Sequence, residues 1–179
     1  MKKVSSVIVL ILTMCFVTTN VAAGNQSGGF SSAKQRYYVQ YSKDYISLAI
    51  LKKAVKRWDN ASANVSLTYS GQKVSTKGIT VSVGVFKPAN EGDLGVTYYS
   101  YGGKKVSNSK TRDAAVCIVY ANSSFVKNSN AIQATLMHEV GHALSLTHTN
   151  GNTDIMRQGI KNYKTLSSND KKWLKKKWG

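Results

Sequence analysis

Residues 138–148 read His-Glu-Val-Gly-His-Ala-Leu-Ser-Leu-Thr-His and contain every histidine of the 179-residue chain. The first two histidines are four positions apart, so on an α-helix they share one face and can offer ring nitrogens to the same ion. The third, His148, reaches that ion if the chain reverses after the helix. The segment therefore predicts a zinc site with His138, His142 and His148 as its ligands.

The glutamate in this segment gives the predicted site a chemistry. Three protein ligands leave one zinc position for water, and Glu139 follows the first ligand directly, where a carboxylate can act as the general base. Asp154 is an alternative third ligand if His148 does not reach the metal. A site closed by four protein ligands would instead make the chain a secreted cationic binding module with a structural zinc and no catalysis.

The segment resembles the signature of the metzincin zinc peptidases, H-E-x-x-H-x-x-G-x-x-H followed by a methionine turn beneath the metal. The matching positions are His138, Glu139, His142, His148 and Met156. Ser145 replaces the family glycine at the helix end, where the backbone usually needs a conformation that glycine adopts at low cost. The related peptidases that use a downstream glutamate as third ligand are excluded, because no Glu follows position 139.

Within the metzincins, most of the chain is similar to the matrixin, or matrix-metalloproteinase-like, catalytic domain. Residues 166–170, Leu-Ser-Ser-Asn-Asp, and the final Trp178-Gly179 resemble the closing matrixin helix. Residues 46–58 and 65–69 resemble its first helix and strand. The resemblance implies a secreted zinc-dependent endopeptidase acting on protein or peptide substrates. It also implies that substrate adds to an edge strand that includes Leu94, Gly95 and Val96.

The resemblance does not extend to specificity or to other metals. After the turn methionine the chain reads Arg-Gln-Gly-Ile at 157–160, without the family's proline and tyrosine, so pocket specificity is not carried over. No histidines remain for a matrixin structural zinc. The one acidic cluster, Asn90, Glu91 and Asp93, offers oxygen ligands for a weak calcium site. One catalytic Zn2+ is therefore expected, and Ca2+ is compatible but not required.

Hydrophobic spacing predicts one α+β domain, metzincin-like, with three helices, a mixed twisted sheet of about five strands, and zinc in its cleft. Leu51, Ala54, Val55 and Trp58 recur at helical spacing within residues 44–58. The zinc-site helix is expected from near Asn130, with Gln133 placed for a capping box, to about 144. Segments rich in β-branched and aromatic residues predict strands at 65–69, 79–85, 94–101 and 114–121.

The N-terminal region predicts export of the protein. Lys2 and Lys3 precede an apolar run over 4–17 and a small-residue cleavage site at 21–23, so residues 1–23 are expected to form a signal peptide and no stable membrane anchor. Residues 24–36 are rich in Gly and Ser and predict a flexible leader. Residues 37–179 would then form the catalytic domain, expected to be a monomer and secreted or associated with the cell surface.

The charge of the chain predicts its partners, and the position of its cysteine predicts whether the thiol is accessible. The chain has 25 basic and 8 acidic residues and a formal net charge of +17, which favours binding to anionic polymers at the cell surface. Positive charge is concentrated near the C-terminus, at Lys171, Lys172 and residues 175–177. Nucleic acid is not expected, because the chain is predicted to be secreted and carries no recognition motif. Cys117, the only cysteine after residue 23, lies in an apolar run and is expected to be buried.

Overall fold

The computed structural model describes residues 24–25, 27–59, 61–73, 77–90, 92–121, 128–159 and 162–179, so the predicted signal peptide lies outside the described residues. The strands are β1 (Lys34–Tyr41), β2 (Ser66–Tyr69), β3 (Gly78–Gly84), β4 (Gly95–Tyr101), β5 (Lys104–Val106) and β6 (Ala114–Tyr120). The helices are α1 (Leu48–Asp59), α2 (Ser129–Ala143) and α3 (Ser168–Trp178).

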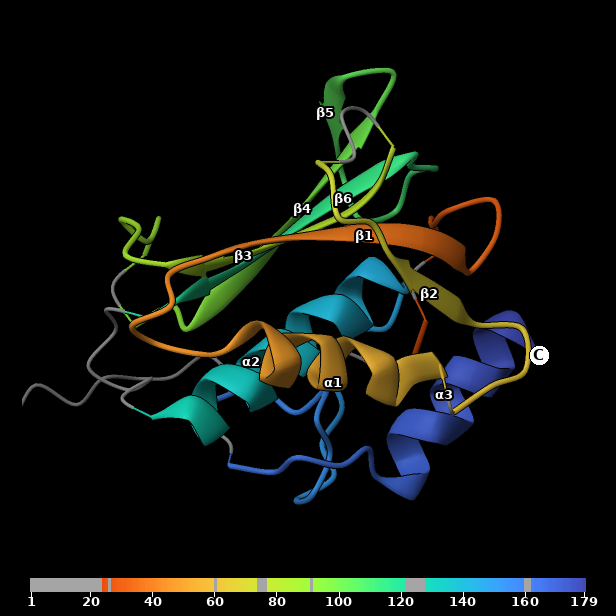
Figure 1. Ribbon diagram of the computed structural model, residues 1–179. Coiled ribbons are helices and arrows are strands. Elements are labelled where there is room, and N and C mark those ends of the chain that lie inside the picture. Colours follow the sequence, from red (N-terminus) through yellow and green to blue (C-terminus); the bar gives the residue numbers. More distant parts are fainter. Residues whose placement is uncertain are drawn as a thin grey trace, which may run out of the picture.

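The strands form one mixed sheet in the order β2-β1-β3-β6-β4-β5. The pairs β2-β1, β1-β3 and β3-β6 are parallel, whereas β4 runs antiparallel to both β6 and β5. The helices lie on one side of this sheet (Figure 1). The predicted α+β domain with three helices and a mixed sheet is confirmed, with six strands where about five were expected.

Helix α1 forms where the spacing of its apolar residues predicts it. Its four predicted apolar residues are each 0% exposed. The Trp58 indole Nε1 donates a hydrogen bond to the Met137 main-chain oxygen at 3.0 Å. This bond ties α1 to α2. The helix begins at Leu48 rather than at residue 44 because residues 43–45 form a turn, in which the Tyr45 amide donates to the Ser42 oxygen at 3.3 Å.

Strand β1 differs from the predicted flexible leader. It begins at Lys34, inside the 24–36 segment, and Phe30 and Ala33 just before it are 7% and 2% exposed. The strand is held on both sides, with Lys34 opposite Ser66 of β2 and Tyr37 opposite Ile79 of β3. Pairing with two neighbouring strands thus makes residues 34–36 part of a strand, although their polar side chains give no strand pattern in the sequence.

Helix α3 packs against the C-terminal end of α2. The Ser167 side chain and the N3 residue Asp170 form a reciprocal capping box at its start, which satisfies main-chain donors that a helix end leaves free. At its other end, the Trp178 Nε1 donates to the Leu144 oxygen at 2.8 Å. Leu174 is 0% exposed. None of the helices in the described ranges is long and apolar enough to span a membrane.

Cys117 lies in β6, in the centre of the sheet, and is 0% exposed, which confirms its predicted burial. Burial raises the pKa of its thiol well above the ordinary value, because a thiolate there would lose its solvation. Cys117 is therefore a packing residue and not a reactive thiol.

Candidate active site

Helix α2 carries the first two histidines through the interior of the domain. It begins at Ser129, and the Asn128 side chain accepts a hydrogen bond from the Ala131 amide at 2.9 Å. Asn128 thus provides the cap, whereas Gln133, predicted to complete a capping box, is 6% exposed inside the helix. The helix packs against α1, β6 and β4, so His138 and His142 are presented from a rigid element beside the sheet.

The chain reverses direction directly after α2. The Leu144 amide donates to the Val140 oxygen at 3.0 Å and the Ser145 amide to the His142 oxygen at 2.9 Å, which ends the helix. Ser145 has φ 71°, the left-handed conformation expected for the position of the family glycine. This reversal brings His148 back toward the two helix histidines.

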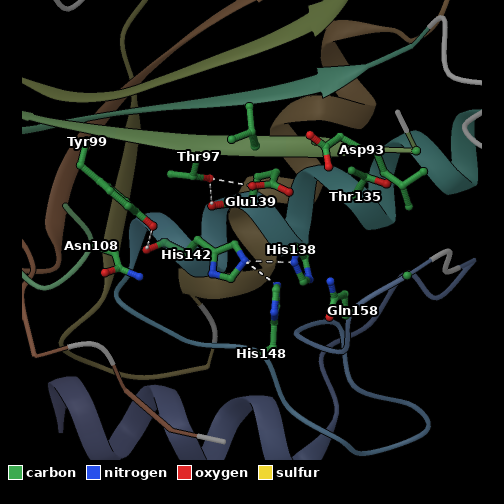
Figure 2. Close-up of a pocket in the computed structure, with 15 residues that line it drawn as sticks. Asp93, Thr97, Tyr99, Asn108, Thr135, His138, Glu139, His142, His148 and Gln158 are labelled. Carbon is green, nitrogen blue, oxygen red and sulfur yellow. Dashed lines mark hydrogen bonds between the residues drawn. The ribbon is translucent and has the colours of Figure 1, made fainter. Parts of the chain in front are cut away.

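The three histidines converge on one point, as Figure 2 shows. The Nε2 atom of His142 lies 3.1 Å from Nε2 of His138 and 3.2 Å from Nε2 of His148. Three nitrogens bound tetrahedrally to one zinc at ordinary bond lengths would be about 3.3 Å apart. The spacing of the three ring nitrogens therefore fits a single zinc ion.

The hydrogen bonds of Nδ1 in two of these rings indicate that their Nε2 atoms can bind a cation. His138 Nδ1 lies 2.7 Å from the Ile155 oxygen, and His142 Nδ1 lies 2.8 Å from the Leu146 oxygen. A carbonyl oxygen only accepts, so each Nδ1 carries the proton and a neutral ring keeps a lone pair on Nε2. Two lone pairs only 3.1 Å apart repel each other unless a cation lies between them. These two rings thus have the protonation pattern that zinc requires.

Glu139 lies beside the histidines with its carboxylate toward β4. It is 4% exposed, and the Thr97 hydroxyl lies 2.8 Å from Oε2 and 2.9 Å from the Glu139 main-chain oxygen, so it donates to one of them at a time. A Cβ at Gly95 would come 2.9 Å from Glu139 Oε1 and 2.7 Å from the Ile118 oxygen. The absence of a side chain at Gly95 therefore gives the carboxylate its place.

These residues line a cleft of about 560 Å3 between α2 and β4. Its walls include all three residues predicted to bind substrate, Leu94, Gly95 and Val96, together with the three histidines and Glu139. Strand β5 pairs with β4 only from Tyr99 onward, so in the described part of the chain no strand covers the outer edge of Gly95 to Tyr98. The Leu94 oxygen accepts from the Tyr120 amide of β6 at 3.0 Å. By alternation, the main-chain groups of Gly95 and Thr97 face the open edge.

The predicted methionine turn packs against α2 next to His138 and is hydrogen-bonded to α3. Ile155 and Met156 are each 0% exposed, and a Cβ added at Gly141 of α2 would overlap Met156 Sδ. Asp170, also 0% exposed, accepts from the Ile155 amide at 2.9 Å and the Met156 amide at 3.1 Å. The Ile155 oxygen contacts His138 Nδ1. By fixing the main chain at Ile155, the Asp170 carboxylate therefore helps to orient His138 indirectly.

Comparison with protein families matches residues 34–179 to the matrixin peptidases. The chain belongs to the matrixin family. Family membership supports a zinc metalloprotease with protein substrates, in agreement with the group of three histidines, whose ligand atoms lie within 4.8 Å of one another. No curated protein sequence gives a significant match to this matrixin.

The alternative third ligand, Asp154, is engaged elsewhere in this matrixin. Its Oδ1 accepts from the Ser167 hydroxyl and its Oδ2 from the Asn169 amide group, both at 2.6 Å. Burial acts to raise the pKa of this carboxyl, but the hydrogen bonds from Ser167 and Asn169 act against burial, and the pKa is lowered overall. Asp154 therefore links the turn to the start of α3, and His148 is the third histidine of the cluster.

The calcium prediction gains no support from the described residues. Asp93 accepts hydrogen bonds from the Asn90 amide at 3.1 Å and from the Asn90 side chain at 3.2 Å, and Glu91 lies outside the described residues. Calcium therefore stays a prediction from the sequence.

Three residues around the site were not singled out from the sequence: Thr97, Asp170 and Arg112. Arg112 is 1% exposed, lies 3.8 Å over the Tyr99 ring, and donates to the Asn108 oxygen at 2.9 Å and the His142 oxygen at 3.4 Å. Its charge thus lies at the negative, C-terminal end of α2. Their contacts with Glu139, Met156 and His142 join residues 42, 14 and 30 positions apart, so no short-range spacing in the sequence indicates these contacts.

We expect Thr97→Val to lower the turnover of a peptide substrate about tenfold, because the variant keeps the branched shape but removes the hydroxyl that orients Glu139. Steady-state kinetics would show the loss mainly in kcat. Thr97→Ser retains the hydroxyl and is the matched control, with turnover within a few-fold of the unaltered protein. Equal turnover in the Val and Ser variants would show that the Thr97 hydroxyl does not position Glu139.

Proposed function

We propose that this matrixin is a secreted zinc-dependent endopeptidase in which His138, His142 and His148 hold one zinc ion and Glu139 is the general base. The observation that carries the proposal is the convergence of three Nε2 atoms at the floor of a cleft, with two of the rings oriented by main-chain oxygens. Secretion is inferred from the signal peptide predicted at residues 1–23.

The open edge of β4 supports binding of an extended peptide. A substrate segment antiparallel to β4 would exchange hydrogen bonds with the main-chain groups of Gly95 and Thr97, and its scissile bond would then pass the histidines. Such main-chain recognition is independent of side-chain identity. It suits an enzyme that cuts within a chain, because it needs no free terminus.

When bound, zinc would polarise the scissile carbonyl group and lower the pKa of a water molecule. Glu139 would take a proton from the attacking water and deliver it to the leaving nitrogen of the substrate. The Thr97 hydroxyl holds Oε2 and so limits the rotation of the carboxylate. The buried position of Glu139 keeps bulk water from competing for the proton.

The alternative, a cationic binding module with a structural zinc, needs a closed site with four protein ligands. The cluster formed by the described residues contains three histidines and faces a cleft of about 560 Å3, which favours a catalytic site. The Asp154 carboxylate, the nearest acid in the sequence after His148, is bound to Ser167 and Asn169 instead.

Metal removal tests this function. We expect the purified protein to cleave an internal bond of a quenched fluorescent peptide, to lose that activity on treatment with a chelator, and to recover it with stoichiometric zinc. Circular dichroism of the metal-free protein provides the control for unfolding, since loss of fold would also abolish activity. Persistent cleavage by protein shown to be free of metal would contradict the proposal.

A further inference from the structure

A second hollow lies at the opposite edge of the sheet from the active-site cleft. It has a volume of about 500 Å3 and is bounded by α1 and by β2, the strand at the far end of the sheet order from β4 and β5 (Figure 1). We refer to it as the α1–β2 groove, lined by Tyr37, Lys52, Lys53, Lys56, Arg57, Leu67, Thr68 and Tyr69. Nothing in the zinc chemistry uses it.

The α1–β2 groove is strongly cationic. Four of its eight lining residues carry positive charge, at positions 52, 53, 56 and 57 on one face of α1, and none of the eight is acidic. Among the described residues the only ion pair made by these cations joins Lys56 to Asp59, at 2.5 Å. Three positive charges are thus left in one groove without a carboxylate, which costs free energy unless an anion binds there.

Lys52 is held in place by an aromatic ring, whereas Arg57 has an unsatisfied donor. Lys52 Nζ lies 4.1 Å from the centre of the Tyr69 ring, and this ring packs 5.5 Å from that of the buried Tyr37. Arg57 Nε is buried and has no hydrogen-bond partner among the residues that the structure describes. Arg57 lines the same groove, and its guanidinium group adds positive charge and hydrogen-bond donors that suit an oxyanion.

The edge of β2 and the Tyr69 ring distinguish three kinds of anionic partner: an acidic peptide, a nucleic acid and an anionic polysaccharide. A peptide could add to this edge as a strand only through the outward-facing main-chain groups. The Leu67 amide already donates to Asp59 Oδ1 at 2.6 Å, so that position on the edge is occupied. Base stacking is also disfavoured, because Lys52 covers the Tyr69 ring. Recognition by side-chain charge alone suits a polymer with repeated sulfate or carboxylate groups.

We infer that the α1–β2 groove binds an anionic polysaccharide carrying sulfate or uronic-acid groups. Lys52, Lys53 and Arg57 provide the contacts to the oxyanions. The groove and the cleft lie at different edges of the sheet, so one molecule holds such a polymer while its cleft stays open. Binding at the groove therefore does not depend on zinc or on peptidase activity.

The test compares two triple variants with the same change in charge. One carries Lys52→Gln, Lys53→Gln and Arg57→Gln; the control carries Lys171→Gln, Lys172→Gln and Lys175→Gln on the exposed face of α3. Titration with a fluorescent heparin oligosaccharide at about 0.15 M salt is expected to show at least a tenfold weaker Kd for the groove variant and a change below about threefold for the α3 variant. Unfolding midpoints and peptide turnover of both variants verify the fold.

Equal losses of affinity in the two triple variants would overturn the assignment of binding to the groove and would indicate attraction by net charge. Unchanged binding in the groove variant would overturn it as well. Polyglutamate or single-stranded DNA binding as tightly as heparin, with the same dependence on the groove residues, would overturn the polysaccharide assignment. If the triple variant fails to fold, Lys53→Glu and Lys172→Glu, both at exposed positions, provide the same comparison with one charge reversal each.

Discussion

Glu139→Gln is expected to lower kcat/KM for an internally cleaved peptide by about 10²–10⁴-fold, the range that a positioned general acid–base group contributes. The amide has the shape of the carboxylate and can still accept a hydrogen bond from the Thr97 hydroxyl, so the packing around residue 139 should persist. It cannot take a proton from water at neutral pH. Because Glu139 is not among the three clustered histidines, zinc should remain bound at one ion per chain.

The measurement pairs steady-state kinetics with metal analysis of the same preparation. Asp93→Asn is the matched control, since Asp93 is the other carboxylate among the described residues that line the cleft, and its removal should change kcat/KM only a few-fold. Activity of the Glu139→Gln protein close to that of the unaltered enzyme would exclude Glu139 as the base. Loss of zinc from this variant would place Glu139 among the ligands instead.

Asp170→Ala is expected to reduce the free energy of unfolding by about 3–5 kcal/mol. The carboxylate accepts hydrogen bonds from three amides, those of Ile155, Met156 and Ser167, at distances of 2.9–3.1 Å in a fully buried position. Alanine leaves these donors without an acceptor and leaves a cavity. A second effect follows at His138, whose Nδ1 contacts the Ile155 oxygen, so zinc affinity should fall at least tenfold.

Denaturant unfolding of the metal-free proteins measures the first effect without the contribution of bound zinc. Competition with a chelator of known affinity measures the second. Ser168→Ala, an exposed position in the same turn of α3, is the control and should change the free energy of unfolding by no more than about 0.5 kcal/mol. An Asp170→Ala protein as stable as this control would show that the turn holds its shape without the carboxylate.

Sequence reasoning succeeded where the signal is local and periodic. The spacing of His138 and His142 places both side chains on one face of a helix, and the apolar positions of α1 repeat with the helical period. The left-handed conformation of Ser145 was also predictable, because a chain that continues as a helix could not return His148 to the others. Each of these features depends on residues only a few positions apart.

Long-range pairing accounts for what the sequence did not indicate. Strand β1 begins with Lys34, Gln35 and Arg36, which form no apolar pattern, and it is a strand because β2 and β3 flank it. Strand β5, only three residues long, is defined by its pairing with β4. Likewise, Thr97 reaches Glu139 across 42 positions of sequence, a contact that only the register of the sheet creates.

X-ray absorption at the zinc edge of the reconstituted protein would show the ligands of the metal itself. We predict one zinc per chain with three imidazole nitrogens at about 2.0–2.1 Å and one oxygen of water, and a spectrum with one imidazole fewer in His148→Ala. A shell with four protein ligands, or one unchanged by His148→Ala, would contradict an open site of three histidines and support a structural metal in its place.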